Sequence, residues 1–493
     1  MSLDSPVLAY AFAKRHGVVL LSADAAGARV GLREDAPADA LLEARRALGR
    51  PLAVERLDAD AFARRLADAY GGSEQAARSE ALEGHGDLDS LIEDIPAAAD
   101  LLETQDDAPV IRLINGLIAE AARLGASDVH LEPYDSALRV RFRVDGVMRE
   151  AAELPARIAP LLVSRVKVMA RLDIAERRIP QDGRISLAMG ARALDVRVST
   201  LPARGGERVV LRLLDKSRGA LSLAELGMPS SVRAAYEHSL RVPHGIVLVT
   251  GPTGSGKTTT LYSGLAVLND GSRNILTVED PVEYAIDGIG QTQVNARVGM
   301  SFAAGLRAIL RQDPDVVMVG EIRDTETAQI AVQASLTGHL VLSTVHTNDA
   351  VGAITRLRDM GIEPFLLASS VRLILAQRLV RRLCPDCRAP IDPAAAAALP
   401  GRGFEAPGWR AVGCPACKHS GYAGRIGLYE AVAVDDTLRR LIGANADETA
   451  LADAAFARAP RLLDAARDAV MRGDTTLEEA FRVTRRDQQD AGV

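Results

Sequence analysis

The 493-residue sequence has no long apolar run and no basic leader. No stretch approaches the roughly 20 consecutive apolar residues that a membrane-spanning helix needs. The first residues, Met-Ser-Leu-Asp-Ser-Pro, carry no basic side chain, and Lys14-Arg15-His16 interrupts any apolar stretch that follows, so we expect no signal peptide. We therefore expect a cytoplasmic chain that reaches a membrane only through a partner.

Aromatic and basic residues are too few for a typical nucleic-acid-binding protein. Only 3% of the residues are aromatic, which leaves little material for stacking against bases, and the net charge is −6. Lysine is also scarce after Lys257, where Lys418 is the only one. The Asn-Lys-x-Asp loop of guanine-specific switches therefore has no counterpart there. A GTP-binding switch is excluded, and a nucleic-acid motor is disfavoured.

The four cysteines occur only as two Cys-x-x-Cys pairs, Cys384 with Cys387 and Cys414 with Cys417. Two such pairs supply the four thiolates of a tetrahedral zinc site, and four protein ligands leave no open coordination position. We therefore expect a structural zinc ion. The alternative is a redox disulfide, although catalytic Cys-x-x-Cys motifs usually occur singly.

Residues 245–262 are the stretch around which the chain is organised. The run Ile246–Thr250 predicts a buried strand, and a helix-compatible segment follows through Val267. Between them lies the Gly-x4-Gly-Lys-Thr pattern of a phosphate-binding P-loop, for which a chance Gly-rich turn is the alternative. Lys257 would reach the β- and γ-phosphates and Thr258 would bind Mg²⁺. The P-loop residues are Gly251, Pro252, Thr253, Gly254, Ser255, Gly256, Lys257 and Thr258.

Three later apolar runs predict strands with polar residues at their ends. Parallel strands deliver their loops to one edge of a sheet, so these side chains could converge on the nucleotide. An acid such as Glu321, at the end of one strand, is suited to orient the attacking water or to hold Mg²⁺. The alternatives are a surface carboxylate at this position and structural histidines. The candidates are Glu279, Asp280, Glu283, Glu321, His339 and His346.

The region before the P-loop predicts an α+β domain with arginines on one face of a sheet. Residues 138–144 alternate strictly, so the apolar residues face a core while Arg139, Arg141 and Arg143 share the other face. Asp145-Gly146 predicts a hairpin turn. The arginines are either solvated surface residues or phosphate contacts, and the sequence leaves both open.

The N-terminal residues 1–78 carry no catalytic constellation and predict a small α/β docking domain. Between Arg78 and Arg112 there is no Lys or Arg, whereas acidic residues accumulate. A segment of one charge sign repels itself and favours extension, so we expect a tether. An ordinary acidic helix surface is the alternative.

Together these motifs resemble the secretion ATPases of bacterial type II systems and type IV pili, over nearly the whole chain. Two further stretches, residues 11–18 and 349–360, favour the type II branch over the pilus extension motors, which remain the alternative. The motifs that carry the resemblance are Ala126–Pro133, Arg178–Arg184, Val198–Pro202, Gly251–Thr258, Thr277–Glu283, Gly320–Asp324 and Leu336–Asp349.

The resemblance implies a hexameric ATPase that uses ATP, Mg²⁺ and Zn²⁺ to drive pseudopilus assembly and protein export, with no nucleic-acid partner. It also implies recruitment to the inner membrane by the type II secretion L protein, which binds the first domain. Glu279, Asp280 and Glu283 match the family's Asp box, Glu321 its Walker B glutamate, and His339 and His346 its His box. The matching arginines near the nucleotide are Arg197 and Arg212 from the second domain, and Arg307, Arg311 and Arg323.

The expected fold class is a multi-domain α/β protein with a RecA-like P-loop ATPase domain and a zinc-knuckle insertion. The expected limits are 1–78 for the docking domain, 79–108 for the acidic linker, 109–225 for the arginine-bearing α+β domain, 226–380 for the RecA-like domain, 381–425 for the tetracysteine subdomain and 426–493 for a C-terminal helical subdomain.

Overall fold

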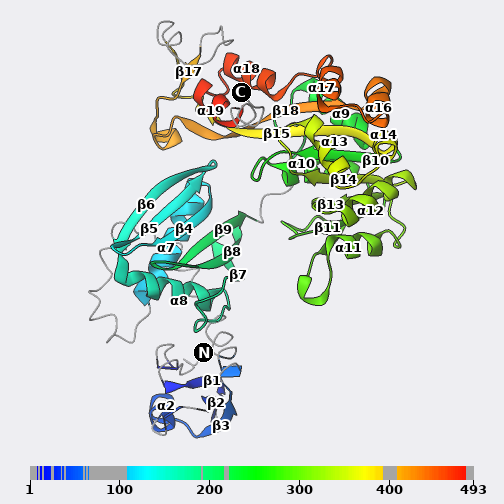
Figure 1. Cartoon of the computed structure of the whole chain (residues 1–493). Helices are drawn as coiled ribbons and strands as arrows, with labels where there is room; N and C mark the ends of the chain where they lie inside the picture. The colour runs from blue at the N-terminus through cyan, green and yellow to red at the C-terminus, as the bar shows by residue number, and fades with distance from the viewer. Residues whose placement is uncertain are drawn as a thin grey trace. The chain divides into compact units, whose positions relative to one another are not determined.

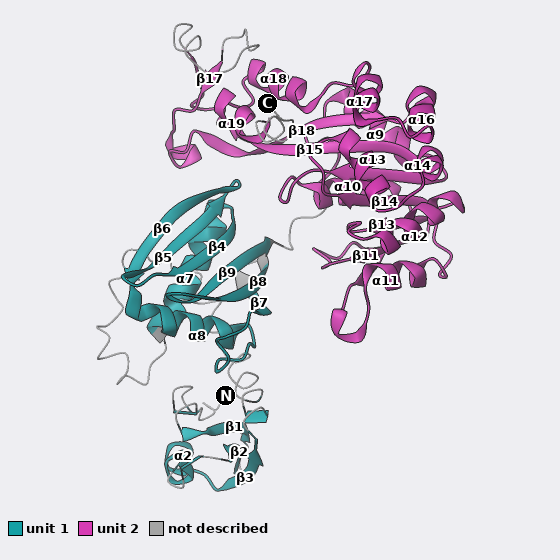
Figure 2. Ribbon diagram, in the orientation of Figure 1, with its two compact units in different colours: residues 1–218 teal, residues 219–493 magenta. Residues whose placement is uncertain are grey.

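The chain divides into two compact units, residues 1–218 and 219–493 (Figure 2). No helix in the described ranges combines the length and the apolar character that crossing a membrane requires. The predicted tether, residues 79–108, lies outside those ranges except for Ala108. The computed structural model describes residues 8, 12–13, 16–23, 27–34, 36–37, 40–58, 61–62, 65, 108–189, 192–215, 221–391 and 408–484.

The N-terminal part of the first unit contains a three-stranded sheet with the order β1-β2-β3. Strand β2 pairs antiparallel with β1 and parallel with β3, and helix α2 makes the crossover between β2 and β3. Helix α2 buries Ala40, Ala44 and Leu48, which recur every four residues along one face. The bounds are β1 Val18–Ala23, β2 Ala28–Arg33, α2 Ala40–Leu48 and β3 Leu52–Leu57.

The rest of the first unit is a six-stranded antiparallel sheet packed against helices α7 and α8 (Figure 1). The order is β6-β5-β4-β9-β8-β7. The predicted alternation in β5 is confirmed, because Val140, Phe142 and Val144 are buried in the core. The predicted hairpin is also confirmed: β5 and β6 pair across Asp145 and Gly146, which both have positive φ. The bounds are α7 Ala108–Leu124, β4 Ala126–Pro133, β5 Ala137–Val144, β6 Val147–Pro155, α8 Ala159–Met169, β7 Gln181–Met189, β8 Arg192–Ala203 and β9 Gly206–Asp215.

The second unit is built on a seven-stranded sheet with the order β12-β11-β13-β14-β10-β15-β18. All neighbouring strands pair in parallel except β15 and β18, which are antiparallel. The predicted strands at the P-loop and after it are all present. The bounds are β10 Gly245–Thr250, β11 Ile275–Glu279, β12 Gly290–Gln293, β13 Val316–Val319, β14 Leu340–Val345, β15 Val371–Leu383 and β18 Tyr422–Ala433.

Helices cover both faces of this sheet, which explains why its central strands are apolar without alternation. Ile246 and Leu248 of β10 pack into one core with α12, α13 and α14, whereas Val247 and Val249 pack into another with α9 and α10. This three-layer arrangement confirms the predicted α/β class. The helix bounds are α9 Ser230–Leu240, α10 Lys257–Leu268, α11 Phe302–Ile309, α12 Thr325–Leu336, α13 Ala350–Asp359 and α14 Pro364–Ser370.

Strands β15 and β18 continue through the predicted limits at residues 380 and 425, so the cysteine segment connects the ends of two strands of the central sheet. Four C-terminal helices add to the core on the α13 side. The remaining bounds are β16 Ala389–Pro390, β17 Trp409–Arg410, α16 Asp436–Gly443, α17 Glu448–Phe456, α18 Leu462–Met471 and α19 Leu477–Thr484.

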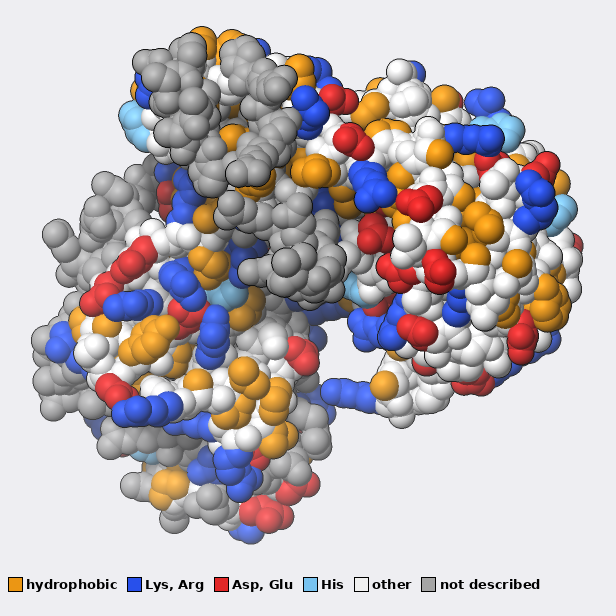
Figure 3. Space-filling view, turned by 45° about the horizontal axis from the view of Figure 1, so that its top comes forward, with side chains coloured by type: hydrophobic (Ala, Val, Ile, Leu, Met, Phe, Trp, Pro, Cys, Tyr) orange, Lys and Arg blue, Asp and Glu red, His pale blue; other side chains and the backbone are white. Residues whose placement is uncertain are grey.

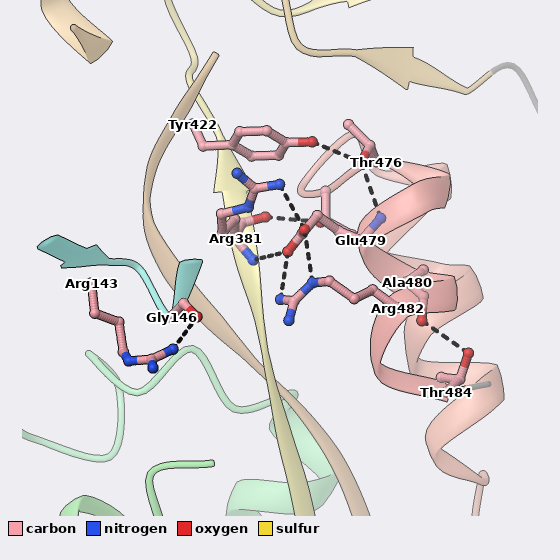
Figure 4. A network of polar contacts seen from close by, with 10 residues as sticks. Arg143, Gly146, Arg381, Tyr422, Thr476, Glu479, Ala480, Arg482 and Thr484 are labelled. Carbon is pink, nitrogen blue, oxygen red and sulfur yellow. Dashed lines mark hydrogen bonds and ion pairs between the residues drawn. The ribbon is translucent and has the colours of Figure 1, made fainter. Parts of the chain in front are cut away.

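A buried carboxylate ties α19 to the two long strands (Figure 4). Glu479 is 2% exposed, and its oxygens accept hydrogen bonds from Arg381 of β15 at 2.7 Å and from Arg482 at 2.9 Å. The Arg381 guanidinium lies over the Tyr422 ring, 3.9 Å from its centre, and the Tyr422 hydroxyl contacts Thr476 at 3.0 Å. These contacts join α19 to the ends of β15 and β18 between which the cysteine segment lies.

Candidate functional site

The P-loop leaves the carboxyl end of β10 through glycines in conformations that other residues rarely adopt. Gly251 has φ 143°, and a Cβ there would clash with the Gln377 carbonyl oxygen. Gly256 has φ 88° and stands directly before helix α10, which begins at Lys257. The loop therefore has the close backbone approach and the helix N-terminus that a phosphate group needs.

The Lys257 ammonium is folded back onto its own loop. Its Nζ donates to the carbonyl oxygens of Gly251 at 2.7 Å and of Pro252 at 3.1 Å. Burial lowers the pKa of Lys257 to about 8, although the Glu321 carboxylate acts in the opposite direction. This cation therefore has two oxygen partners where the P-loop would receive phosphates.

Glu321 and His346 meet Lys257 at the carboxyl edge of the sheet. The Glu321 carboxylate lies 2.6 Å from Nε of Arg323 and 3.5 Å from Nε2 of His346. The other ring nitrogen of His346 is 3.5 Å from the Lys257 Nζ. Burial, and then the charge of Lys257, lowers the pKa of His346, which favours a neutral ring in this state. The structure thus brings three of the predicted site residues into one cluster.

Glu279 lies at the end of β11 but is enclosed in a hydrogen-bond network. The residue is 2% exposed and accepts hydrogen bonds from the hydroxyls of Tyr262 and Thr277 and from the Gln291 amide at 3.1 Å. The Tyr262 hydroxyl also accepts the Glu283 backbone N–H at 3.2 Å. Glu279 therefore anchors the segment that carries Asp280 and Glu283.

His339 is not brought to this cluster. It precedes β14, whose first residue pairs with Gly245 at the amino end of β10, whereas the P-loop follows the carboxyl end. Its Nδ1 lies 2.8 Å from the Ala334 carbonyl oxygen. Parallel strands carry loops at both edges, and the two histidines of this segment belong to opposite edges.

Two predicted arginines of the second unit, Arg307 and Arg311, make contacts around helix α11. Arg307 pairs with Glu326 at the start of α12, and Arg311 donates to the Arg307 carbonyl oxygen at 2.9 Å. Arg323, in contrast, belongs to the cluster through Glu321.

Strand β15 contributes site residues that the sequence analysis missed. The Gln377 amide donates to the Ser255 carbonyl oxygen at 2.5 Å and accepts from Thr260 at 2.7 Å, which braces the P-loop. Arg378 donates to the Asn348 carbonyl oxygen at 2.9 Å, in the loop after His346. The available signal was the Gln377-Arg378 pair, which interrupts the apolar run of residues 373–380 in this strand.

In the first unit, the arginine face is partly neutralised by buried carboxylates of β4. Asp128 pairs with Arg212 at 2.9 Å and with Arg143 at 3.6 Å. Glu132 pairs with Arg141 at 2.7 Å and with Arg208. Such intermixing of basic and acidic side chains is also visible on the face of the molecule in Figure 3. Arg197 stands opposite Arg212 in the β8–β9 register.

The four cysteine sulfurs form a compact cluster. Sγ of Cys384 is 3.9 Å from that of Cys414, Sγ of Cys387 is 3.8 Å from that of Cys417, and all four lie within 4.8 Å of one another. Four thiolates around one zinc ion, with Zn–S distances of about 2.3 Å, stand about 3.8 Å apart. Backbone N–H groups of Gly413, Cys414 and Gly421 donate to sulfurs at 3.1–3.3 Å. The donor set fits a closed zinc site, and the spacing is too long for disulfides.

A family model described as "Type II/IV secretion system protein" matches residues 103–482, more than half of the chain. The chain belongs to the type II/IV secretion system protein family. A second model, which describes an N-terminal domain of "GSPII protein E", matches residues 7–70 of this family member. The resemblance stated from the motifs is therefore confirmed.

Relatives of this secretion ATPase align over nearly its whole length. It is 57% identical to the type II secretion system protein E of Pseudomonas aeruginosa, with 97% of this chain and 96% of the relative covered. It is 53% identical to the type II secretion system ATPase E of Vibrio cholerae, with the same coverage. The crystal structure of the pilus retraction motor PilT with bound ADP matches with 27% identity and a TM-score of 0.51, covering 75% of this chain and 96% of PilT. The chain is a P-loop ATPase.

From the cysteine cluster we predict a structural zinc ion. Cys414→Ser removes one thiolate, and zinc binding contributes on the order of 10 kcal/mol to folding such a segment. We expect this variant to lose bound zinc and to become less soluble. Atomic absorption and thermal melting of the purified protein measure both effects, and a zinc-free variant with unchanged melting temperature would contradict the prediction.

Proposed function

We propose that the chain is a cytoplasmic, hexameric ATPase that drives pseudopilus assembly and protein export in a type II secretion system. The observation that carries this proposal is the cluster of Lys257, Glu321 and His346 beside the P-loop. Full-length similarity to proteins named type II secretion system protein E supports the cellular role.

In the proposed mechanism, the P-loop backbone binds the phosphates of ATP and the α10 N-terminus adds its positive dipole end. Lys257 exchanges the Gly251 and Pro252 carbonyls for phosphate oxygens. The Thr258 hydroxyl and nearby carboxylates would hold Mg²⁺, which neutralises phosphate charge when bound. The four cysteines would hold Zn²⁺ as a structural ion.

Glu321 is the proposed residue that orients the attacking water. It stands at the end of a buried strand, and Arg323 and His346 fix the position of its carboxylate. We assign Glu279 to positioning, because three donors already occupy its oxygens. Asp280 and Glu283 remain the proposed acids of this segment that contact Mg²⁺ or water. The proposed phosphate contacts also include His346, Arg307, Arg311 and Arg323, whereas His339 lies at the opposite edge of the sheet and is not assigned a phosphate contact.

Arg197 and Arg212 of the first unit are proposed to contact the γ-phosphate of ATP. The ion pair between Arg212 and Asp128 would hold that guanidinium extended from the sheet while its remaining donors stay available. Hydrolysis would then require side chains of the first unit as well as those of the P-loop unit.

The central test of the catalytic assignment is Glu321→Gln. This change keeps the size of the side chain but removes the charge that orients water, so we expect hydrolysis to fall about a hundredfold while ATP binding persists. Phosphate release and equilibrium binding of a fluorescent ATP analogue measure the two effects. An equal loss of binding would instead assign Glu321 mainly to the metal. Lys257→Ala is the matched comparison, for which we expect weaker binding itself.

The proposed membrane partner is the type II secretion L protein, bound through the N-terminal domain. The match of residues 7–70 to a family model of their own supports a separate module there, and a module on a tether raises the local concentration of a motor at its site of action. Association with the inner membrane would then be peripheral and depend on this partner.

Deletion of residues 1–78 tests the docking proposal. We expect that the truncated chain no longer sediments with inner membranes and no longer supports secretion. Its basal rate of ATP hydrolysis in solution should stay close to that of the full chain. Membrane fractionation alongside the ATPase rate makes the measurement. Continued sedimentation of the truncated chain with membranes would place docking elsewhere in the protein.

A further inference from the structure

Glu430 is a buried carboxylate that the mechanism above does not use. It lies on β18, opposite Ala376 of β15, and is 2% exposed. One carboxylate oxygen accepts the backbone N–H of Ala350 at 2.8 Å, and the other accepts that of Leu462 at 3.0 Å. A buried carboxylate is costly unless hydrogen bonds satisfy both oxygens, and here two do so.

These two N–H groups belong to the first residues of two helices, α13 and α18. The first N–H groups of a helix have no partner within it, and the positive end of its dipole favours an anion. In α13 the side chain of Asp349 accepts the N–H of Gly352 at 2.7 Å and leaves that of Ala350 to Glu430. A single carboxylate therefore caps both helices and joins them.

Helix α13 directly follows the loop His346–Asp349. The beginning of this loop is fastened to β10, because the Thr347 N–H donates to the Thr250 hydroxyl at 3.0 Å. Its middle is fastened to β15, because Arg378 donates to the Asn348 carbonyl oxygen. Glu430 fastens its end and also contacts the C-terminal helix α18.

We propose that Glu430 is a positioning residue for ATP hydrolysis, which holds the His346 loop in its catalytic place and couples it to the C-terminal helix α18. Movement of α18 would shift Glu430, and with it the first turn of α13 and the ring that lies beside Glu321. The inference rests on the proposed ATPase mechanism, in which His346 acts at the phosphates.

The surroundings of Glu430 make its ionisation depend on pH near neutrality. Burial raises the pKa of Glu430 to about 7; the N–H groups of Ala350 and Leu462 oppose this, Asp349 at the start of α13 adds to it, and Arg461 before α18 opposes it. Because folding raises this pKa, the carboxyl keeps its proton at pH values where the unfolded chain has lost it. The ionised carboxylate, which accepts hydrogen bonds at both oxygens, predominates only above about pH 7.

The experiment compares Glu430→Gln with the wild-type full chain in steady-state hydrolysis of MgATP between about pH 6 and pH 8.5. The glutamine amide keeps the size of the side chain but replaces one carboxylate oxygen by an NH₂ group. This donor would face a backbone N–H, so one of the two hydrogen bonds is lost. We expect kcat to fall about tenfold with KM changed less than about twofold, because a shifted loop misplaces His346 while the P-loop and Lys257 still bind the phosphates. We also expect the rise of kcat through about pH 7 in the wild type to be absent in the variant.

The matched control is Glu448→Gln, which makes the same chemical change in a neighbouring helix. Glu448 accepts a hydrogen bond from Thr355 of α13 at 3.1 Å, but it is exposed and lies away from the first turn of that helix. We expect wild-type kcat and pH dependence from this variant.

Hydrogen exchange separates positioning from a general loss of stability. If Glu430 fastens the loop, Glu430→Gln accelerates exchange at residues 346–352 and 462–464 while the central strands stay protected. Wild-type kcat and pH profile in Glu430→Gln, or a loss of activity that only follows the unfolded fraction, would overturn the inference. A wild-type chain without any ATP hydrolysis would instead contradict the proposed function.

Discussion

The hydrogen bonds between the buried Lys257 ammonium and the carbonyls of its own loop are the interaction on which the site of the second unit depends. A buried cation is stable only where oxygen atoms surround it, and the loop supplies two of them within 3.1 Å. The loop carbonyls follow the carboxyl end of β10, which lies between two parallel neighbours. The strands β14 and β15 on either side then deliver His346 and the Gln377–Arg378 pair to the same edge.

The sheet that carries this site is buried on both faces. Helices exclude water from either side of the sheet, so the polar side chains inside it must find partners within the protein. Thr250 pairs with Thr347, Gln377 with Ser255 and Thr260, and Glu279 with Tyr262. Each of these hydrogen bonds joins different segments of the chain, and those of Thr250 and Gln377 join segments far apart in sequence. The catalytic loops are therefore positioned by interior hydrogen bonds as well as by the strands that precede them.

Local patterns predicted the P-loop, the buried strands that follow it and the paired cysteines, because in each case neighbouring residues carry the signal. The sequence could not predict the partners of Glu279 or Glu430, since Tyr262, Gln291 and Leu462 come from distant elements without a motif. It assigned two histidines to one strand, but only the register of β10 and β14 shows that His339 lies at the opposite edge. Alternation located the arginines of β5, whereas the β4 carboxylates that pair with them depend on strand order.

In the proposed mechanism, Lys257 leaves its loop carbonyls to contact the phosphates of ATP. Titration calorimetry of the full chain with MgATP at about pH 8, in two buffers of different ionisation enthalpy, tests it directly. Because burial holds the pKa of Lys257 near 8 and phosphate oxygens would raise it, binding should take up a fraction of a proton. Lys257→Arg, whose guanidinium stays charged, should bind without that uptake. A binding enthalpy that is the same in both buffers for the wild-type chain would contradict the account.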